Sequence, residues 1–430
     1  MNSRTLDNTC QCLSLDRAQL DRALDADAEA AVILRLIRER CPHALSAAPV
    51  FASRTQLARM AGIVRAVETV VALPAYREQV LASAPAIARR DPHGARGVLF
   101  GFDFHLREEA LALIEVNTNA GGLMLNALLA RGQRACCDEM RELMPDAAGI
   151  AALEQRIVGM FREEWQRAGA PRALEHIVIV DAAPEQQYLY PEFLLFQRLF
   201  QHHGLRASIT DPSELQLRDG ALWHAGGRVD IVYNRLTDFM LEQPENAVLQ
   251  AACLAGAALI TPHPQAHALY ADKRNLAILT DPRQLQALGV PQATRDLLCA
   301  SIPATEIVTA ARADVLWHNR RQLFFKPATG FGSRAVYRGD KLTRRVWQDI
   351  LAGGYVAQAL SPAGERVVAA GATPARLKFD VRNYVYGGDV LWVAARFYQG
   401  QTTNMRTPGG GFAPVYSRDE AKTLAASAGP

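Results

Sequence analysis

Ile114-Glu115-Val116-Asn117-Thr118-Asn119, followed by Gly121-Gly122, places a carboxylate and a carboxamide two residues apart near the end of a strand-like run. Alternate residues of a β-strand point to the same face, so Glu115 and Asn117 are expected to lie side by side. Both side chains offer hard oxygen ligands, which Mg²⁺ accepts beside nucleotide phosphates. The stretch therefore predicts a metal site on one face of a strand.

Two later segments have side chains suited to the same kind of site. Lys326 lies in an apolar run just before the loop Gly330-Phe331-Gly332-Ser333. Glycines let backbone amides approach a phosphate closely, and a buried lysine needs an anionic partner. Farther on, Asp380 and Arg382 share one face of a strand-like run. Each segment also has a structural alternative: a hairpin turn for the glycines, and a surface ion pair for Asp380 and Arg382.

The bulk composition is that of an ordinary globular protein. The chain has 430 residues, of which 49% are hydrophobic and 21% charged, and this length predicts two or three domains. The net charge of +3 does not indicate a nucleic-acid partner, and no apolar run reaches the length of a membrane span. Seven cysteines without a Cys-x-x-Cys pair support neither a disulfide framework nor a zinc site. With no secretory signal visible in Met1–Asp16, we expect a cytoplasmic location.

Changes in hydrophobic periodicity predict how the chain is organised. Helical patterns dominate up to about Pro92, including a helix opened by the capping box Ser53-Arg54-Thr55-Gln56. Two strand-like runs joined by Arg107-Glu108-Glu109 then predict a β-hairpin, and alternating strands and helices from His176 predict a small parallel α/β domain. The expected divisions are 1–170 (helices plus the hairpin), 171–265 (the α/β substrate-binding domain), 266–416 (the nucleotide-binding domain) and 417–430 (a loosely held tail).

Two weaker candidates for nucleotide contacts are Lys273 and Gln358. Lys273 follows Asp272 just ahead of an apolar run, and Gln358 ends the strand-like Tyr355-Val356-Ala357-Gln358. In isolation, a helix start and an ordinary core strand explain these segments better.

The loop after Arg396 is denser in polar residues. It carries Asn404 and Arg406 ahead of Gly409-Gly410-Gly411. Because a merely flexible turn does not need arginine and asparagine so densely, this loop predicts an anion-binding hollow.

Together these segments resemble the ATP-grasp superfamily, and in particular its circularly permuted branch that includes the eukaryotic-type glutathione synthetases. The resemblance covers about Gly97 to Tyr416 and rests on the order of the motifs. In most ATP-grasp enzymes the Glu-x-Asn comes last, whereas here it comes first, which indicates the permutation. The implied fold is α/β (α+β): a permuted ATP-grasp core, a small parallel α/β substrate domain and an N-terminal helical segment.

The resemblance implies roles for individual residues. Val232-Tyr233-Asn234-Arg235 is similar to a strand end where an arginine meets substrate, and Lys273 and Lys326 are similar to the two nucleotide lysines. The nucleotide-binding residues implied in this way are Lys273, Lys326, Gly330, Gly332, Ser333 and Gln358.

Two later stretches, Lys378 to Arg382 and Arg396 to Gly410, resemble a second ATP-grasp group, the bacterial glutathione synthetases and peptide-glutamate ligases. In that group an aspartate binds metal, and a later arginine and asparagine stabilise the reacting acyl group. The implied metal ligands are Glu115, Asn117 and Asp380, and the implied catalytic residues are Arg396, Asn404 and Arg382. The implied substrate contacts are Arg235, Arg406, Gly409 and Gly410.

Two departures from the family pattern concern the metal and the substrate. The eukaryotic-type enzyme has a metal-binding glutamate in its glycine-rich loop; this loop has none, so we assign that role to Asp380. The hairpin before Glu115 has no arginine at its core, where Phe102, Asp103 and His105 lie instead. The substrates of glutathione synthetase itself are therefore not implied.

The activity implied by the resemblance is that of a carbon–nitrogen ligase that uses ATP and Mg²⁺. ATP converts a carboxylate to an acyl phosphate, which an amine then attacks, with ADP and phosphate as products. The expected partners are a small-molecule or short-peptide carboxylate and an amine, with no nucleic acid and no membrane, and the branch suggests a homodimer. Two alternatives remain: an ATP-dependent kinase on the same fold, and a non-catalytic nucleotide-binding regulatory protein.

Overall fold

The computed structural model describes residues 13–15, 28–135, 138–170, 172–330, 335–370, 373–404 and 406–417. Gly332 and Ser333, which were predicted to contact phosphate, lie outside the described residues, as does the predicted tail beyond residue 417. Within the described ranges, no helix combines the length and the apolar character that crossing a membrane requires.

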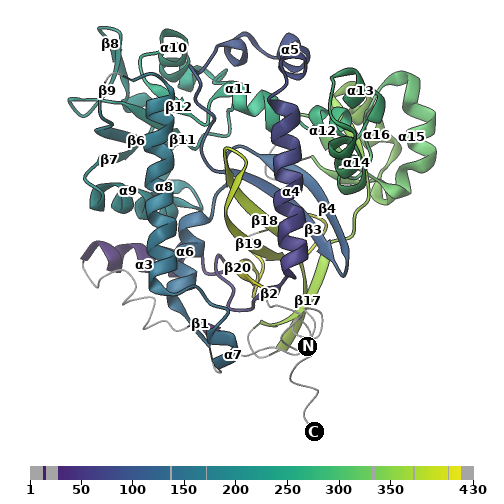
Figure 1. Ribbon diagram of the computed structural model, residues 1–430, viewed down its shortest axis with the longest axis horizontal. Coiled ribbons are helices and arrows are strands. Elements are labelled where there is room, and N and C mark those ends of the chain that lie inside the picture. The colour runs from purple at the N-terminus through teal and green to yellow at the C-terminus, as the bar shows by residue number, and fades with distance from the viewer. Residues whose placement is uncertain are drawn as a thin grey trace.

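A central sheet joins the early and late parts of the chain. Its strand order is β2-β20-β19-β18-β3-β4, and β17 pairs with the first half of β18. In Figure 1 the blue hairpin β3–β4 lies beside the yellow strands β18 and β19. The predicted hairpin across Arg107–Glu109 is confirmed. The bounds are β2 Val50–Phe51, β3 Phe100–Arg107, β4 Ala110–Asn117, β17 Gly364–Ala370, β18 Thr373–Tyr386, β19 Asp389–Tyr398 and β20 Gly411–Tyr416.

Helix α4 (Arg54–Val71) covers one face of this sheet (Figure 1). The predicted capping box opens it: the Ser53 hydroxyl accepts a hydrogen bond from the Gln56 amide at 3.1 Å, and Gln56 Oε1 accepts one from the Ser53 amide at 2.8 Å. Its buried side chains, among them Ile63 and Val67, pack in one apolar cluster with Phe102 of β3. This cluster holds α4 against the sheet, because apolar residues of both share one interior.

Gly121-Gly122, at the end of the opening stretch, starts helix α6 (Leu123–Gly132). Gly122 has a φ of +103°, and a Cβ atom at this position would overlap the Phe412 ring, so the turn requires glycine. The Glu192 carboxylate accepts hydrogen bonds from the amides of Gly122 and Met124 and caps the helix.

The predicted parallel α/β region is present, with strand order β12-β11-β6-β7. Its strands are β6 His176–Val180, β7 Arg206–Thr210, β11 Ile231–Asn234 and β12 Leu259–Thr261. Helices α9 (Tyr190–His202) and α10 (Ala247–Ala255) belong to it, and a small antiparallel sheet is formed by β8 Gln216–Arg218, β9 Ala221–His224 and β10 Gly227–Arg228.

A further antiparallel sheet, with strand order β13-β16-β14-β15, lies in the region predicted to bind nucleotide. Helices α12–α16 gather at the right of Figure 1. The bounds are β13 Thr305–Ile307, β14 Leu323–Pro327, β15 Tyr337–Arg338, β16 Tyr355–Ala359, α12 Arg274–Leu279, α13 Pro282–Ala287, α14 Gln292–Ser301, α15 Ala313–Asn319 and α16 Arg344–Ala352.

The remaining elements belong mainly to the predicted N-terminal helical segment. They are β1 Leu13–Leu15, α3 Ala28–Arg40, α5 Pro74–Ala82, β5 Gln133–Ala135, α7 Asp138–Arg141, α8 Ala147–Arg167 and α11 Pro264–Ala266. Sequence patterns missed the short strands β2, β12 and β13, which are two or three residues long, and also the longer β17 and β20. Such short strands show no periodicity, so only their sheet partners define them. The domain boundaries and the permutation stay predictions.

Candidate functional site

The register of the central sheet brings opposite charges onto one face. In β3, Phe102 and Phe104 enter the apolar cluster, and Asp103 alternates to the other face. Asp103 is the direct cross-strand partner of Arg382 in β18. One strand farther, Asp380 pairs in the same way with Arg396 of β19.

A β-bulge in β4 is needed to present the predicted metal ligands on that face. Phe104 pairs with Leu113, whereas Asp103 pairs with Glu115, so Ile114 is an extra residue. Strict alternation would place Glu115 on the same side as the buried Leu113. The extra residue moves Glu115 to the side of Asp103.

Lys326 is buried next to this bulge, with 9% of its surface exposed. Its ammonium group donates to the Ile114 carbonyl at 3.1 Å and to Gln358 Oε1 at 2.7 Å. Burial lowers the pKa of Lys326 to about 8, against the opposing effect of Glu115. Among the described residues, the hydrogen-bond partners of this buried cation are both neutral, so Lys326 is well suited to an anionic ligand.

Glu115 and Asn117 together offer oxygen atoms to a cation. Burial alone would raise the pKa of Glu115, but Lys273, Lys326 and a hydrogen bond from Asn117 lower it to about 2, so the carboxylate is ionised. Asn117 Nδ2 donates to Glu115 Oε1 at 3.2 Å and to Asp103 Oδ2 at 2.9 Å. This leaves Asn117 Oδ1 without a hydrogen bond to any described residue. An ionised carboxylate beside a free amide oxygen fits Mg²⁺.

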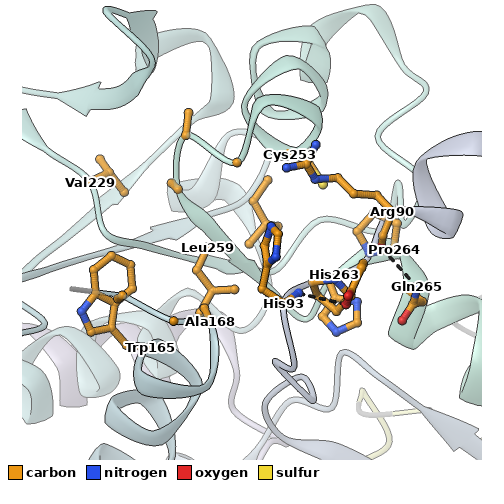
Figure 2. Close-up of a pocket in the computed structure, with 18 of the residues that line it drawn as sticks. Arg90, His93, Trp165, Ala168, Val229, Cys253, Leu259, His263, Pro264 and Gln265 are labelled. Atoms are coloured by element: carbon orange, nitrogen blue, oxygen red, sulfur yellow. Dashed lines mark hydrogen bonds between the residues drawn. The ribbon is translucent and has the colours of Figure 1, made fainter. Parts of the chain in front are cut away.

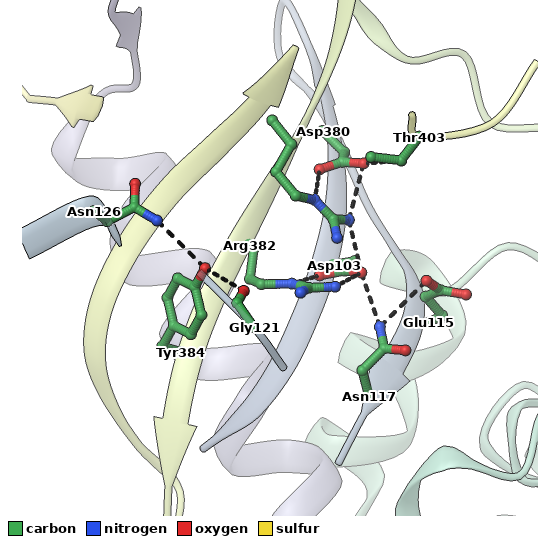
Figure 3. Close-up of polar contacts among 10 residues, drawn as sticks. Asp103, Glu115, Asn117, Gly121, Asn126, Asp380, Arg382, Tyr384 and Thr403 are labelled. Carbon is green, nitrogen blue, oxygen red and sulfur yellow. Dashed lines mark hydrogen bonds and ion pairs between the residues drawn. The ribbon is translucent and has the colours of Figure 1, made fainter. Parts of the chain in front are cut away.

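Asp380, Arg396, Asp103 and Arg382 form a cluster of alternating charge. Arg382 donates from Nε and Nη2 to the two oxygens of Asp103, both at 2.6 Å. Arg396 donates to Asp103 at 2.8 Å and to Asp380 at 2.7 and 3.0 Å. Thr403 also donates to Asp380, at 2.6 Å. Figure 3 shows Asp103 between the side chains of Arg382 and Asn117. The two carboxylates and two guanidinium groups compensate each other inside the protein.

The two candidate metal ligands, the two lysines and both arginines border one cavity of about 290 Å³. The predicted site residues that line it are Glu115, Asn117, Lys273, Lys326, Gly330, Gln358, Arg382 and Arg396. Lys273 donates to the Gly330 carbonyl at 2.8 Å, which ties it to the start of the glycine-containing loop. Residues from the two ends of the chain thus meet in one cavity.

Asp380 and Arg235 are buried but are not among the residues that line the cavity. Asp380 faces Arg396 and Thr403 instead. Arg235 follows β11, and its Nη1 donates to the Ala120 carbonyl at 3.4 Å. Burial raises the pKa of Asp181, which follows β6, to about 6, and Arg235 opposes this shift. Arg235 and Asp181 both lie at the carboxyl ends of parallel strands, the edge at which α/β sheets bind ligands.

The predicted anion-binding loop folds partly onto itself. Asn404 and Arg406 are exposed, and Asn404 Oδ1 accepts a hydrogen bond from the Arg406 amide at 2.9 Å. The Gly410 amide donates to the Thr407 carbonyl at 2.8 Å, and the Gly409 carbonyl accepts from Ser46 at 3.3 Å. The described part of this loop that lines the cavity is Gln401, Thr402 and Thr403.

Sequence reasoning assigned no role to Asp103, His105, Tyr398 or Thr403. Asp103 and His105 alternate with apolar residues in β3, a pattern that could have marked them as sharing a polar face, but only the bulge places Glu115 on that face. His105 hydrogen-bonds through Nδ1 to the Ser361 carbonyl at 2.7 Å, and burial lowers its pKa. Thr403 had no comparable signal, because only the folded loop brings it to Asp380.

A second cavity, of about 230 Å³, lies between the segment that includes Arg90, the ends of α8 and α10, and the start of β12. Figure 2 shows Trp165 and Arg90 at opposite sides of it. In its buried His263, Nδ1 accepts a hydrogen bond from the Ala266 amide and Nε2 is hydrogen-bonded to the Ala95 carbonyl. None of the predicted site residues lines this cavity, so the candidate site is the first one.

Comparison with solved structures supports the fold assignment. A glutathione synthetase-like effector from Globodera pallida, in its apo form, matches 87% of this chain and 90% of its own, with a TM-score of 0.55 and 13% sequence identity. This match shows that the chain shares the fold of a glutathione synthetase-like protein, as its motifs predicted. The mixed α/β class is confirmed with it.

Weaker matches accompany it. A γ-glutamylcysteine synthetase-like protein from Methylobacillus flagellatus matches 81% of this chain and 85% of its own (TM-score 0.44, 10% identity). The ATP-grasp ligase PsnB, complexed with minimal precursor, Mg and ADP, matches 56% of this chain and 87% of its own (TM-score 0.30, 14% identity). Neither a protein-family model nor a curated protein sequence matches the chain.

Proposed function

We propose that this protein is an ATP-dependent carboxylate–amine ligase that forms an amide or peptide bond through an acyl phosphate and releases ADP and phosphate. One observation supports it above the others: Glu115 and Asn117 share a single cavity with Lys273, Lys326 and Arg396. That set combines cation ligands, phosphate-binding lysines and a donor for a developing oxyanion.

The nucleotide is assigned to the side of the cavity formed by β14 and β16. Lys273 and Lys326 neutralise phosphate charge, and Lys326 exchanges two neutral partners for an anion when a nucleotide binds. The loop from Gly330 to Ser333 is assigned to the phosphates, and Gln358 to the nucleotide beside Lys326.

Glu115 and Asn117 would hold Mg²⁺, which supplies charge neutralisation beside the phosphates. Asp380 is retained as a third ligand, and it reaches a cation only if Arg396 and Thr403 release its carboxylate. The structure therefore supports Glu115 and Asn117 more directly than Asp380.

Arg396 and Arg382 are assigned to the reacting acyl group, and Asn404 and the amides of Gly409 and Gly410 are further donors once the loop rearranges. Arg235 and Arg406 are assigned to a substrate carboxylate, which arginine holds by paired hydrogen bonds. Closure of the loop that carries Thr403 would exclude water from the acyl phosphate. We further propose small-molecule or short-peptide substrates, a cytoplasmic location and a homodimer.

The test is a screen of amino acids, small peptides and polyamines for ADP release from Mg·ATP, with mass spectrometry of the products. A ligase gives a condensed product and amine-dependent ADP release, a kinase gives a stable phosphorylated product, and a regulatory binder gives no ADP.

Lys326→Ala and Glu115→Gln should each lower turnover by about 10²–10³-fold, the cost of one charge-stabilising group. Lys341→Ala, at an exposed lysine, is the control and should keep full turnover. Full activity in Lys326→Ala would contradict the scheme.

A further inference from the structure

Asp103 is fully buried between two arginines that line the cavity. We propose that Asp103 is a positioning residue, which fixes Arg382 and Arg396 so that one amino group of each is presented to an anionic group of the substrate. This inference rests on the proposed ligase function for its chemistry. The hydrogen bonds between Asp103 and the two arginines do not depend on that function.

Asp103 is ionised in this arrangement. Burial raises its pKa, and Arg382 and Arg396 oppose that shift. The hydrogen bonds of Asp103 favour the carboxylate over the protonated acid, because each partner donates: Arg382 twice, Arg396 once and Asn117 once. A proton on Asp103 would meet donors on every side. The carboxylate is therefore an acceptor that holds three side chains at once.

The fixed arginines keep one donor group each. Arg382 uses Nε and Nη2 on Asp103, and Arg396 uses Nε and Nη2 on Asp380 and Asp103. Nη1 of either arginine makes no hydrogen bond to the described residues, and both side chains line the cavity. Donors that are already in place need no reorganisation when negative charge develops. The pair suits an anion with two oxygens, such as a carboxylate or a phosphoryl group.

The same carboxylate connects this pair to the metal ligands. Asp103 Oδ2 accepts from Asn117 Nδ2, which turns the amide so that its Oδ1 remains available. Asp103 is also the cross-strand partner of Glu115, directly at the β-bulge. One buried charge therefore orients both the arginine pair and the amide of Asn117.

Gly101 provides the space that Arg382 needs. A Cβ atom at Gly101 would lie 2.9 Å from Arg382 Nε and 2.8 Å from Ala120 Cβ, so an alanine would push the guanidinium away from Asp103. Gly101→Ala thus displaces Arg382 without removing any charge. It is a useful second variant because Asp103 variants leave buried charge uncompensated.

The first experiment compares Asp103→Asn with a matched control, Asp230→Asn. Asp230 is a buried carboxylate that accepts hydrogen bonds from Arg172 and from the amides of Glu175 and His176, and it does not line the cavity. Both variants should lower the melting temperature. Asp103→Asn should also lower kcat by about 10²-fold with KM for ATP little changed, whereas Asp230→Asn should keep kcat. Equal kcat losses in the two folded variants would overturn the proposal.

A double-mutant cycle separates positioning from general destabilisation. If Asp103 acts through Arg382, then Asp103→Asn should cost much less kcat in an Arg382→Gln background than in the wild type. Gly101→Ala should lower kcat in the same direction as Asp103→Asn. Additive effects in the cycle, together with normal kcat in Gly101→Ala, would contradict a positioning role.

A binding measurement tests Asp103 without turnover. In the presence of Mg·ADP, inorganic phosphate should raise the melting temperature of the wild type further, and Asp103→Asn should lose that phosphate increment while keeping the Mg·ADP increment. If the wild type shows both increments but no ligase products, the proposed function fails and the role of Asp103 stands. If Asp103→Asn keeps the full phosphate increment, the role of Asp103 fails whatever the reaction.

Discussion

Lys326 and Glu115 determine each other's charge in the candidate site. Burial lowers the pKa of Lys326 to about 8, and Glu115 raises it from what burial alone would give. In turn Lys273 and Lys326 hold the pKa of Glu115 at about 2 against its burial. Glu115 is therefore ionised at every working pH, whereas Lys326 changes charge just above neutrality.

Binding of Mg·ATP should weaken as the pH rises through about 8, because Lys326 loses its positive charge there. Above that pH the association constant of the free protein should fall by up to about tenfold per pH unit. Titration calorimetry between pH 6.5 and 9.5 measures this. Lys326→Arg stays protonated over the range and should remove the decline. An unchanged decline in Lys326→Arg would assign it to another group.

Glu115→Gln should move that decline to lower pH. Removing the carboxylate withdraws an interaction that raises the pKa of Lys326, and Lys273 still lowers it. The comparison should use Mg-free ATP, so that loss of a metal ligand does not obscure the effect on Lys326. A decline at the wild-type pH would show that the two residues are not coupled.

At the scale of elements, the bulge in β4 decides which face the predicted metal ligands occupy. Side chains alternate between the two faces of β4 both before and after Ile114. Because Ile114 is an extra residue, Leu113 and Glu115 lie on opposite faces: Leu113 and Val116 enter the apolar cluster, and Glu115 faces Asp103. The bulged carbonyl then serves as a partner for Lys326.

Deleting Ile114 should remove the bulge, and Glu115 should still face Asp103, because Leu113 and Glu115 would then be consecutive residues on opposite faces. The deletion removes the carbonyl that accepts a hydrogen bond from Lys326, so the free energy of unfolding should fall by about 1–3 kcal/mol, the cost of leaving a buried donor unsatisfied. Urea denaturation measures the loss. Ile114→Ala keeps the residue count and the carbonyl and should retain activity. An unchanged free energy of unfolding in the deletion variant would show that the bulged carbonyl does not stabilise Lys326.

At the scale of the whole molecule, the cavity has walls from three places in the chain: the hairpin β3–β4, the sheet that contains β14 and β16, and the strands β18 and β19. A ligand that fills the cavity would contact all three. Its binding energy therefore stabilises their relative placement as well as their individual folds.

Saturating Mg·ATP should raise the free energy of unfolding by about 2.7 kcal/mol at a ligand concentration 100 times Kd. Thermal unfolding with ATP, with and without EDTA, separates the contribution of Mg²⁺. In the double variant Glu115→Gln/Asn117→Ala, the Mg²⁺-dependent part should disappear while the ATP-dependent part remains. Mg²⁺-dependent stabilisation that survives in this variant would place the metal elsewhere.

Much of the architecture was predictable because the signals are local. The capping box at Ser53, the hairpin across Arg107–Glu109 and the parallel α/β region follow from residues close together in the sequence. The resemblance in fold to a glutathione synthetase-like protein was also predictable from the motifs. The short strands were not, because strands of two or three residues exist only through partners distant in the chain.

The sequence by itself determined which groups are available: an acidic and an amide oxygen two apart, two lysines, and charged pairs on late strands. Only the tertiary structure decided how they are used. Asp380 and Arg396 face each other, Arg382 turns to Asp103, and Arg406 stays outside the cavity. The reason is that side-chain alternation is a property of one strand, whereas pairing, register and the bulge at Ile114 depend on strands brought together by the whole fold.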